Sequence, residues 1–245
     1  MKNKWYWTFK NILFGPALRV WNRPWSENMD RIPESGPAIL ASNHQSVMDS
    51  FYFPLLCPRQ IFFVAKEEYF TTPGFVGRMQ NWFFSSVGQV PIRRTGANAA
   101  DDMLASVKRI LEADELFGIY PEGTRSPDGR VYRGRTGMAR VAMETGIDVI
   151  PIAMIDSRKA NPIGTWIPRP AKVGVRVGEP IDPHAWAAQR GLDPKEHETR
   201  RAFTDFFMHE LAALVGQPYV DVYASDVKTS LAKGLGYPKG AGPSQ

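Results

Sequence analysis

Residues 37–49 read PAILASNHQSVMD, and this stretch decides which fold the chain is expected to adopt. Its first residues, PAILAS, form a short apolar run, which is typical of a strand covered on both faces of a sheet. The polar residues after Ser42 predict a turn, followed by a helix that begins near Ser46. His44 is therefore expected at the carboxyl edge of the sheet, where open α/β folds bind their ligands.

Apolar runs and helical patterns alternate along the rest of the chain. Apolar residues such as Phe203, Phe207 and Leu211 recur on one stripe of a helical pattern, and Gly146 is the expected C-terminal cap of another. The predicted strands are 37–42, 60–65, 87–92, 116–120, 148–155 and 171–177, and the predicted helices are 98–113, 134–145 and 197–215. This order predicts an α/β fold with a mixed, mostly parallel central sheet flanked by helices.

The composition fits one α/β domain of generous size. The chain has 245 residues, of which 43% are hydrophobic and 22% are charged, and this argues against a disordered protein. A net charge of +5 suits an anionic partner, whether nucleic acid, anionic lipid or a phosphorylated small molecule. The single cysteine, Cys57, excludes an intrachain disulfide and a cysteine-rich metal site. The sequence has no apolar stretch of about eighteen residues, so no transmembrane helix is predicted.

The N-terminal segment differs from the rest of the chain. It contains basic residues mixed with aromatic ones and no acid up to residue 25, and Gly15-Pro16 predicts a bend between two helical pieces. Such a mixture is typical of a segment in the lipid headgroup layer, while the alternative is a helix packed on its own domain. The residues concerned are Trp5, Trp7, Trp21 and Trp25 with Lys2, Lys4, Lys10, Arg19 and Arg23.

Three parts of the chain are predicted. Residues 1–30 form an amphipathic arm, residues 31–216 form the α/β domain, and residues 217–245 form a C-terminal extension with a loose tail. Within the domain, residues 69–86 are a second apolar and aromatic patch. The pattern does not separate a core helix from a lipid-facing element there.

His44 and Asp49 are candidates for general-base chemistry. Asp49 is expected in the first turn of the helix, where its carboxylate can fold back toward the imidazole. A carboxylate that holds one imidazole nitrogen fixes the tautomer, and the other nitrogen can then take a proton from an alcohol. The alternative is that Ser46 caps the helix and His44 is an ordinary loop histidine.

Two further segments place cationic side chains at strand ends. Residues 120–126 read YPEGTRS, in which Gly123 allows a tight turn and Arg125 offers a forked guanidinium that matches a phosphate. Residues 88–94 read GQVPIRR and end in Arg93 and Arg94. Read alone, each segment also fits a solvated turn.

Taken in order, these motifs resemble the glycerolipid acyltransferase family, which includes bacterial 1-acylglycerol-3-phosphate acyltransferases. The family motif Asn-His-four residues-Asp is met by Asn43, His44 and Asp49, and Pro-Glu-Gly-Thr-Arg-Ser by residues 121–126. Arg94 stands in the place of the family arginine and Arg93 in that of an aspartate, which leaves open which of them meets phosphate. The resemblance spans about residues 32–180 and includes Lys66 and Pro151.

The activity that this resemblance implies is transfer of a fatty acyl group from acyl-CoA or acyl carrier protein to the free hydroxyl of lysophosphatidic acid. The product would be phosphatidic acid, in phospholipid biosynthesis. His44 would be the general base, and Asp49 would orient it. The residues implied for the acceptor phosphate are Glu122, Gly123, Thr124, Arg125, Arg94, Arg93 and Lys66, with Asn43 and Pro151 in support.

The same resemblance implies no metal and no bound cofactor, because the acyl thioester is a co-substrate. The expected partners are a lysophospholipid, the acyl donor and an anionic membrane surface, and not nucleic acid. The expected location is peripheral, or monotopic, on the cytoplasmic face of the cell membrane. The alternatives are the same chemistry on glycerol-3-phosphate, another lysophospholipid or a glycolipid, a non-catalytic lipid-binding module, and a phosphate-ester hydrolase.

Overall fold

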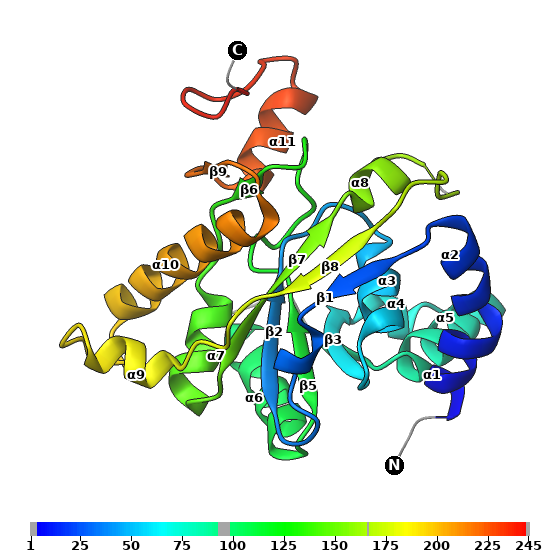
Figure 1. The fold of residues 1–245 in the computed structure, drawn as a ribbon, viewed down its shortest axis with the longest axis horizontal. Helices are drawn as coiled ribbons and strands as arrows, with labels where there is room; N and C mark the ends of the chain where they lie inside the picture. The colour runs from blue at the N-terminus through cyan, green and yellow to red at the C-terminus, as the bar shows by residue number, and fades with distance from the viewer. Residues whose placement is uncertain (1–3, 93–98, 166, 244–245) are drawn as a thin grey trace.

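A seven-stranded sheet forms the centre of the protein in the computed structural model (Figure 1). The structure describes residues 4–92, 99–165 and 167–243, except for the side chains at 66, 68, 69, 76, 80, 83 and 84. Across the sheet, the strands are β1 (Trp25–Glu27), β8 (Gly174–Val177), β7 (Val149–Ile155), β2 (Ala38–Ser42), β5 (Leu116–Ile119), β3 (Ile61–Lys66) and β4 (Gln89–Ile92).

Most neighbouring strands of this sheet run parallel. Only the pair β7 and β8 is antiparallel among the strands of the described sheet. The predicted mixed, mostly parallel sheet is therefore confirmed, and each of the six predicted strands is present. The seventh strand, β1, was not predicted.

The side chains of β2 show how the sheet divides the core. Ala38 and Leu40 pack in one buried cluster with Tyr52 of α3 (Asp49–Leu56), while Ile39 and Ala41 pack in the other. This alternation follows from the two-residue period of a strand. The helices that pack in the second cluster are α6 (Ala99–Glu112), α7 (Gly137–Thr145), α9 (Pro183–Ala188) and α10 (His197–Val215).

The predicted helices are found with small shifts at their ends. The helix at 197–215 is confirmed as α10, and Gly146 caps α7 with a left-handed φ of 67°. The helix after the His44 turn begins at Asp49 rather than near Ser46. The Asp49 carboxylate accepts from the main chain of Gln45 and Ser46, so these residues form the turn before the helix.

The N-terminal arm is a bent helical segment with one face on the domain. It consists of α1 (Lys4–Thr8), a π-helical turn η1 (Phe9–Leu13) and α2 (Gly15–Trp21). The Tyr6 hydroxyl donates to the Pro54 carbonyl at 3.3 Å, and the Lys10 ammonium donates to the carbonyl of Cys57. The opposite face is exposed and carries Trp5, Trp7, Ile12, Leu13, Val20 and Trp21. Of the described helices, none is long and apolar enough to cross a bilayer.

Trp25 does not belong to the arm. It pairs with Gly174 in the parallel ladder of β1 and β8, and its indole ring occupies the space that a side chain at Gly174 would fill. The predicted arm boundary at residue 30 is therefore wrong, because the sheet already begins at Trp25. A short 3-10 turn, η2 (Met29–Arg31), then leads toward β2.

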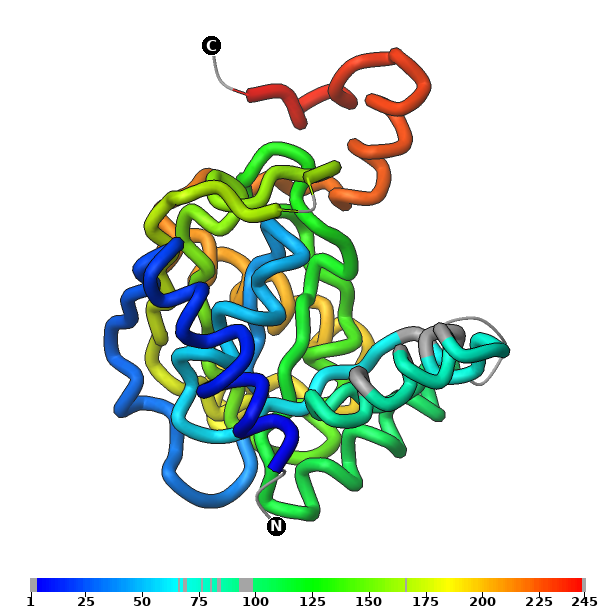
Figure 2. The backbone as a smooth tube through the Cα atoms, turned by 90° about the vertical axis from the view of Figure 1, so that its right-hand side faces the viewer, coloured from blue at the N-terminus to red at the C-terminus, as the bar shows by residue number. Residues whose placement is uncertain are grey.

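The segment 69–86 lies on the surface. Helices α4 (Glu68–Thr71) and α5 (Gly74–Ser86) form a pair that protrudes from the body of the molecule (Figure 2). Phe75 is 77% exposed, and Trp82 packs edge-on against Trp5 of the arm with ring centroids 5.0 Å apart. For Phe75 and Trp82, among the described side chains, the core-helix alternative is therefore wrong.

The C-terminal extension contacts the domain at several positions up to residue 242. A small parallel sheet joins β6 (Val131–Tyr132) to β9 (Tyr219–Val220), and α11 (Ala224–Ala232) follows. Tyr132, Val227 and Ala241 share a buried cluster. The prediction of a loose tail is therefore corrected through residue 242, because the Arg130 guanidinium donates to the carbonyls of Ala241 and Gly242.

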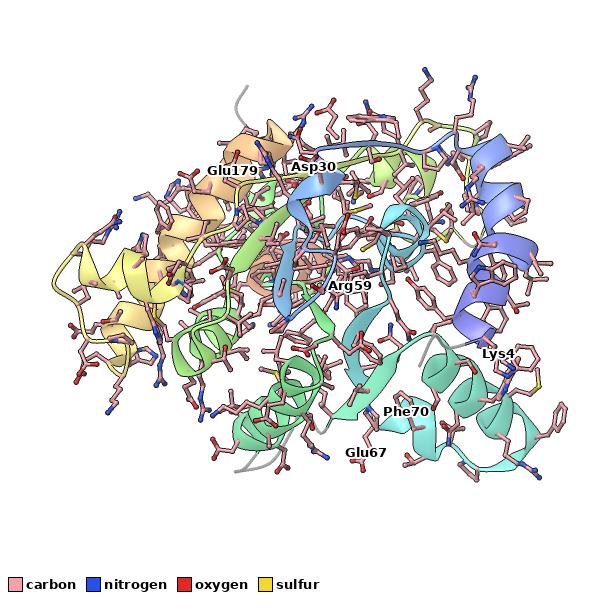
Figure 3. All side chains as sticks on the ribbon, turned by 60° about the horizontal axis from the view of Figure 1, so that its bottom comes forward. Lys4, Asp30, Arg59, Glu67, Phe70 and Glu179 are labelled. Carbon is pink, nitrogen blue, oxygen red and sulfur yellow. The ribbon has the colours of Figure 1, made fainter. Side chains whose placement is uncertain are left out.

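Arg59, which is labelled in Figure 3, links segments of the main chain at the amino edge of the sheet. Its guanidinium donates to the carbonyls of Pro33, at 3.0 Å, and Gly36, at 2.7 Å, and also to that of Asp114. These carbonyls belong to the segments that lead into β2 and β5. These three carbonyls are thus hydrogen-bonded within the fold, and the candidate site lies at the opposite, carboxyl edge.

Candidate active site

Two turns meet at the carboxyl edge of the sheet. Strands β2 and β5 are parallel neighbours with Ala41 opposite Ile119, so the segments that leave them start side by side. The Ser126 amide donates to the His44 carbonyl at 2.6 Å, and the His44 amide donates to Glu122 Oε1 at 3.2 Å. The two motifs that the sequence places about 80 residues apart therefore form one site.

His44 and Asp49 form a hydrogen-bonded pair. Nδ1 of His44 lies 2.9 Å from Oδ2 of Asp49, which also accepts from the amides of Gln45, at 2.7 Å, and Ser46, at 2.8 Å. Because this oxygen accepts, Nδ1 is assigned the hydrogen and Nε2 the lone pair. The Asp49 side chain is fully buried, while the His44 side chain is 17% exposed. The geometry thus fixes one imidazole nitrogen and leaves the other as a base.

Asn43 and Ser46 hold the turn in place. The Asn43 side chain donates to the Met154 carbonyl at 3.0 Å and accepts from the Met154 amide at 2.7 Å, so it continues the β2–β7 ladder by one residue. The Ser46 hydroxyl donates to Asn161 Oδ1 at 2.9 Å and accepts from the Met48 amide at 3.0 Å. Ser46 therefore positions the turn that carries His44. Asn43 supports the site in the same way, by fixing the main chain of this turn to β7.

Tyr120 is a site residue to which the sequence analysis gave no role. Its ring stacks on the His44 imidazole with centroids 4.0 Å apart, and on its other side Phe63 stacks at 5.6 Å. Burial raises the pKa of the Tyr120 phenol, which shares a 3.1 Å hydrogen bond with the Ser50 hydroxyl. Its position directly before Pro121 in the turn was the available signal, but one sequence does not show which way the ring points.

Glu122 is buried between the two turns. Its Oε1 accepts from the His44 amide at 3.2 Å, and its Oε2 accepts from the Tyr132 amide at 3.3 Å. Burial raises the pKa of this carboxyl to about 8, even though both hydrogen bonds lower it. The structure thus gives the Glu122 side chain a different role from the predicted phosphate contact: it holds the main chain of His44.

The next three residues form the exposed part of the turn. Gly123 has a φ of +70°, which is a left-handed conformation that favours glycine. The Thr124 hydroxyl accepts from Lys228 Nζ at 2.8 Å. Arg125 is half-buried and lies close enough to Lys228 to repel it. The predicted phosphate residues Gly123, Thr124 and Arg125 are therefore brought together beside His44.

The structure describes only one of the four remaining predicted site residues in full. Arg93 and Arg94 lie outside the described residues, as does the side chain of Lys66. Pro151 is buried in β7 opposite Ala41, and its ring packs against Gly178. Its supporting role is therefore packing within the sheet, next to β2. Within the described ranges, no group of three or more His, Cys, Asp and Glu side chains could hold a metal ion.

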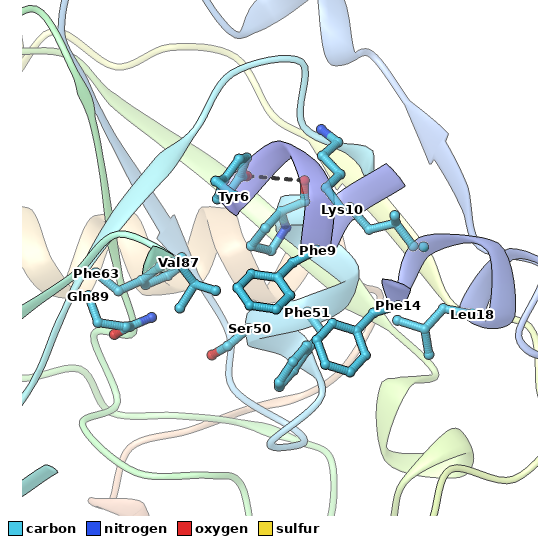
Figure 4. A pocket seen from close by; sticks show the side chains of 13 residues that line it. Tyr6, Phe9, Lys10, Phe14, Leu18, Ser50, Phe51, Phe63, Val87 and Gln89 are labelled. Atoms are coloured by element: carbon cyan, nitrogen blue, oxygen red, sulfur yellow. Dashed lines mark hydrogen bonds between the residues drawn. The ribbon is translucent and has the colours of Figure 1, made fainter. Parts of the chain in front are cut away.

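An apolar cavity lies behind Tyr120. Its walls come from the arm, from α3 and from β3, and Figure 4 shows Phe9, Phe14 and Phe51 around it. Ser50 and Phe63 also line this cavity, and both contact Tyr120, whose ring covers His44. The cavity is therefore linked to the imidazole through Ser50, Phe63 and the ring of Tyr120.

The strands and turns around the His44–Asp49 pair match a known protein family. The Acyltransferase family model matches residues 24–155, which is more than half of the chain, and the chain belongs to this family.

Relatives of this chain carry more specific names. It is 34% identical over 140 residues to the chloroplastic 1-acyl-sn-glycerol-3-phosphate acyltransferase LPAT1 of Arabidopsis thaliana, covering 57% of this chain and 38% of that protein. It is 27% identical over 135 residues to the 1-acyl-sn-glycerol-3-phosphate acyltransferase of Helicobacter pylori, covering 54% of this chain and 55% of that protein. The chain thus spans about half the length, or less, of these curated relatives.

A solved structure extends the similarity over most of the chain. The crystal structure of the 1-acyl-sn-glycerophosphate (LPA) acyltransferase PlsC from Thermotoga maritima is similar with a TM-score of 0.63 and 26% sequence identity. The match covers 88% of this chain and 80% of that one. It therefore reaches beyond the region that the family model matches.

Proposed function

We propose that this protein is a 1-acylglycerol-3-phosphate O-acyltransferase, which moves a fatty acyl group from acyl-CoA or acyl carrier protein to the free hydroxyl of lysophosphatidic acid. The observation that carries this proposal is the His44–Asp49 pair beside the cationic turn at residues 122–126. The names of the two related proteins and of the similar crystal structure support the choice of acceptor.

The reaction follows from the hydrogen-bond pattern of His44. Nε2 takes the proton of the acceptor hydroxyl while Nδ1 stays bonded to Asp49. The alkoxide oxygen attacks the thioester carbonyl, and an oxygen–carbon bond forms. The carbon–sulfur bond then breaks, and the thiolate leaves with the proton that the imidazolium held. The buried Asp49 stabilises the imidazolium and keeps the ring from rotating.

The cavity behind Tyr120 suits the acyl chain. Its walls are mostly aromatic and aliphatic, and two of its lining residues, Ser50 and Phe63, contact the Tyr120 ring that stacks on His44. An acyl chain in the cavity and a phosphate on the turn would bring the thioester carbonyl and the hydroxyl together at Nε2 of His44. Burial of each methylene of the chain contributes about 0.8 kcal/mol.

The exposed face of the arm suits a membrane surface. Trp7 is 55% exposed and Val20 is 78% exposed, and the neighbouring α5 adds Phe75 and Met79 to this side of the molecule. Apolar and aromatic side chains next to Lys4 and Arg19 favour the headgroup layer of an anionic leaflet. The protein would then act as a peripheral enzyme on the cytoplasmic face. Lys10 does not take part, because it is turned inward to Cys57.

Product analysis tests the proposed reaction. The purified protein is incubated with lysophosphatidic acid and acyl-CoA or acyl carrier protein, and mass spectrometry with position-specific digestion identifies the phospholipid. His44→Ala should lower kcat by roughly a hundredfold to ten thousandfold. Asp49→Asn should also act on kcat, because an amide presents the wrong partner to Nδ1.

The result also separates the alternatives. Acylation of glycerol-3-phosphate or another lysophospholipid in preference to lysophosphatidic acid would replace the acceptor and keep the chemistry. Near-normal turnover of a folded His44→Ala protein would overturn the mechanism. Binding of lysophosphatidic acid without any product would favour a non-catalytic lipid-binding module.

A further inference from the structure

The C-terminal extension reaches the turn of residues 122–126. Lys228 in α11 donates from Nζ to the Thr124 hydroxyl at 2.8 Å. One residue before α11, the Tyr223 ring lies 4.9 Å from the Arg135 guanidinium, and Arg135 donates to Ser225 at 3.2 Å. An added Cβ at Gly123 would come within 3.3 Å of the Arg135 side chain. The extension is thus held directly against the site.

A second element brings another cation to the same turn. Arg158 in the short helix α8 (Ser157–Ala160) donates from Nη1 to the Ser126 carbonyl at 3.2 Å. A guanidinium has five N–H donors, so this bond leaves most of its donors for another acceptor. Arg158 follows the end of β7, which is a neighbour of β2 in the sheet.

The charges at this position repel one another in the protein alone. Partial burial and the nearby Arg125 lower the pKa of Lys228, and Arg158 acts in the same direction. Glu122 is the acid that opposes them, but it is buried and already accepts two main-chain hydrogen bonds. A cluster of cations that is not balanced by exposed acids is stabilised by a bound anion.

We propose that Lys228 and Arg158 bind the phosphate of the acceptor together with Arg125, so that the C-terminal extension completes the substrate site. Both residues lie outside the 24–155 range of the family model. The proposal rests on the proposed function for the identity of the acceptor. In lysophosphatidic acid the phosphate is one carbon away from the reacting hydroxyl, and the turn that carries Arg125 bonds to the His44 main chain.

Substitutions of Lys228 distinguish two roles for this residue: binding the acceptor phosphate, or only attaching the C-terminal extension to the domain as a tether. Lys228→Met keeps the length of the side chain and removes its charge, while Lys228→Arg keeps the charge. Lys228→Met should raise the KM for lysophosphatidic acid by about tenfold or more with little change in kcat, and Lys228→Arg should recover most of the loss. Lys233→Met, at the end of the same helix, is the matched control and should match the wild type.

Arg158 is tested in the same way. Arg158→Met should raise the KM for the acceptor, and Lys159→Met, which changes the next residue on the exposed surface, should not. A tether would instead lower the melting temperature or kcat of Lys228→Met and leave the acceptor KM unchanged. That outcome would overturn the proposal.

Binding of inorganic phosphate makes the test independent of acyl transfer. Phosphorus NMR with inorganic phosphate compares wild type, Lys228→Met and Lys233→Met at one ionic strength, and it needs no turnover. Weaker phosphate binding by Lys228→Met, but not by Lys233→Met, supports the anion site. This conclusion holds even if the protein does not acylate lysophosphatidic acid, a result that would contradict only the proposed function. Equal binding by wild type and Lys228→Met, including binding by neither, would overturn the inference.

Discussion

At the scale of single residues, the burial of Glu122 makes stability depend on pH. Its pKa is about 8 in the folded protein, because burial raises it from 4.5. Between these values the folded state binds one proton more than the unfolded state. The contribution of protonated Glu122 to the free energy of unfolding is complete below about pH 4.5 and is lost as the pH rises to about 8. The free energy of unfolding changes over this range by at most about 1.4 kcal/mol per pH unit.

Glu122→Gln removes this titration. The free energy of unfolding of the wild type, relative to the variant, should fall as the pH rises from about 5 to about 8 and then level off. Chemical denaturation at several pH values measures it, with Glu210→Gln on the exposed face of α10 as the control. A difference between wild type and Glu122→Gln that stays constant over this range would contradict the prediction.

The residues of the site were predictable where a short motif carries them. His44 and Asp49 are five positions apart, so their contact follows from one strand-to-helix turn. Lys228 is 104 positions from Thr124, and no local pattern links them. Glu122 was predicted as a site residue with the wrong contact, because sequence does not show that both its oxygens face main-chain amides.

At the scale of elements, the shape of the arm depends on Gly15. A Cβ at this position would lie 1.8 Å from the Lys10 carbonyl oxygen and 3.1 Å from the Leu55 side chain. A larger side chain at position 15 would therefore clash with the π-helical turn η1. Gly15 is also buried, at the place where the arm contacts α3.

Gly15→Ala should destabilise the protein by about 1–3 kcal/mol, mainly by loosening the arm. Thermal unfolding measures the loss, and limited proteolysis should cut first within residues 4–21. Gly242→Ala is the control, because no atom lies within 4 Å of a Cβ built there. An unchanged melting temperature for Gly15→Ala would show that the arm adapts by bending elsewhere.

Elements with a strong internal pattern were predicted best. The apolar runs of β2 and β7 and the apolar stripe of α10 are long enough to be read from the chain alone. Strand β1 was missed because it has only three residues, two of them exposed, and its pairing depends on the distant Gly174. The packing of the last residues was missed for a similar reason, since Arg130 holds them from far away in the sequence.

At the scale of the whole molecule, the site lies between parts that come from both ends of the chain. The arm contributes Phe9 and Phe14 to the cavity behind Tyr120, and the extension brings Lys228 to the cationic turn. In Figure 1 α11 lies above the central sheet and the arm lies to its right. The proposed acyl chain and the proposed phosphate would thus be bound by segments that are far apart in the sequence, and both would reach the site that contains His44.

The exposed face of the arm predicts how the protein meets a membrane. Trp7 and Val20 are exposed, and burial of each in the headgroup layer should contribute about 1–2 kcal/mol. The double variant Trp7→Glu with Val20→Glu should therefore bind anionic phospholipid vesicles roughly a hundredfold more weakly in a sedimentation assay. High salt should release the wild type only partly, because it screens Lys4 and Arg19 but not the apolar contacts.

The control for this experiment is Leu235→Glu, which changes a residue that is 74% exposed in the C-terminal extension. Like each of the two changes in the double variant, it replaces an exposed apolar side chain with one glutamate, yet it lies away from the arm, so it should sediment like the wild type. Circular dichroism must first show that the double variant is folded, because the other face of the arm packs on α3 through Tyr6 and Gly15. If the folded double variant sediments fully with vesicles, the arm is not the anchor. Phe75 and Met79 on the protruding α5 then become the surface to substitute, since they are the next exposed apolar side chains on that side of the molecule.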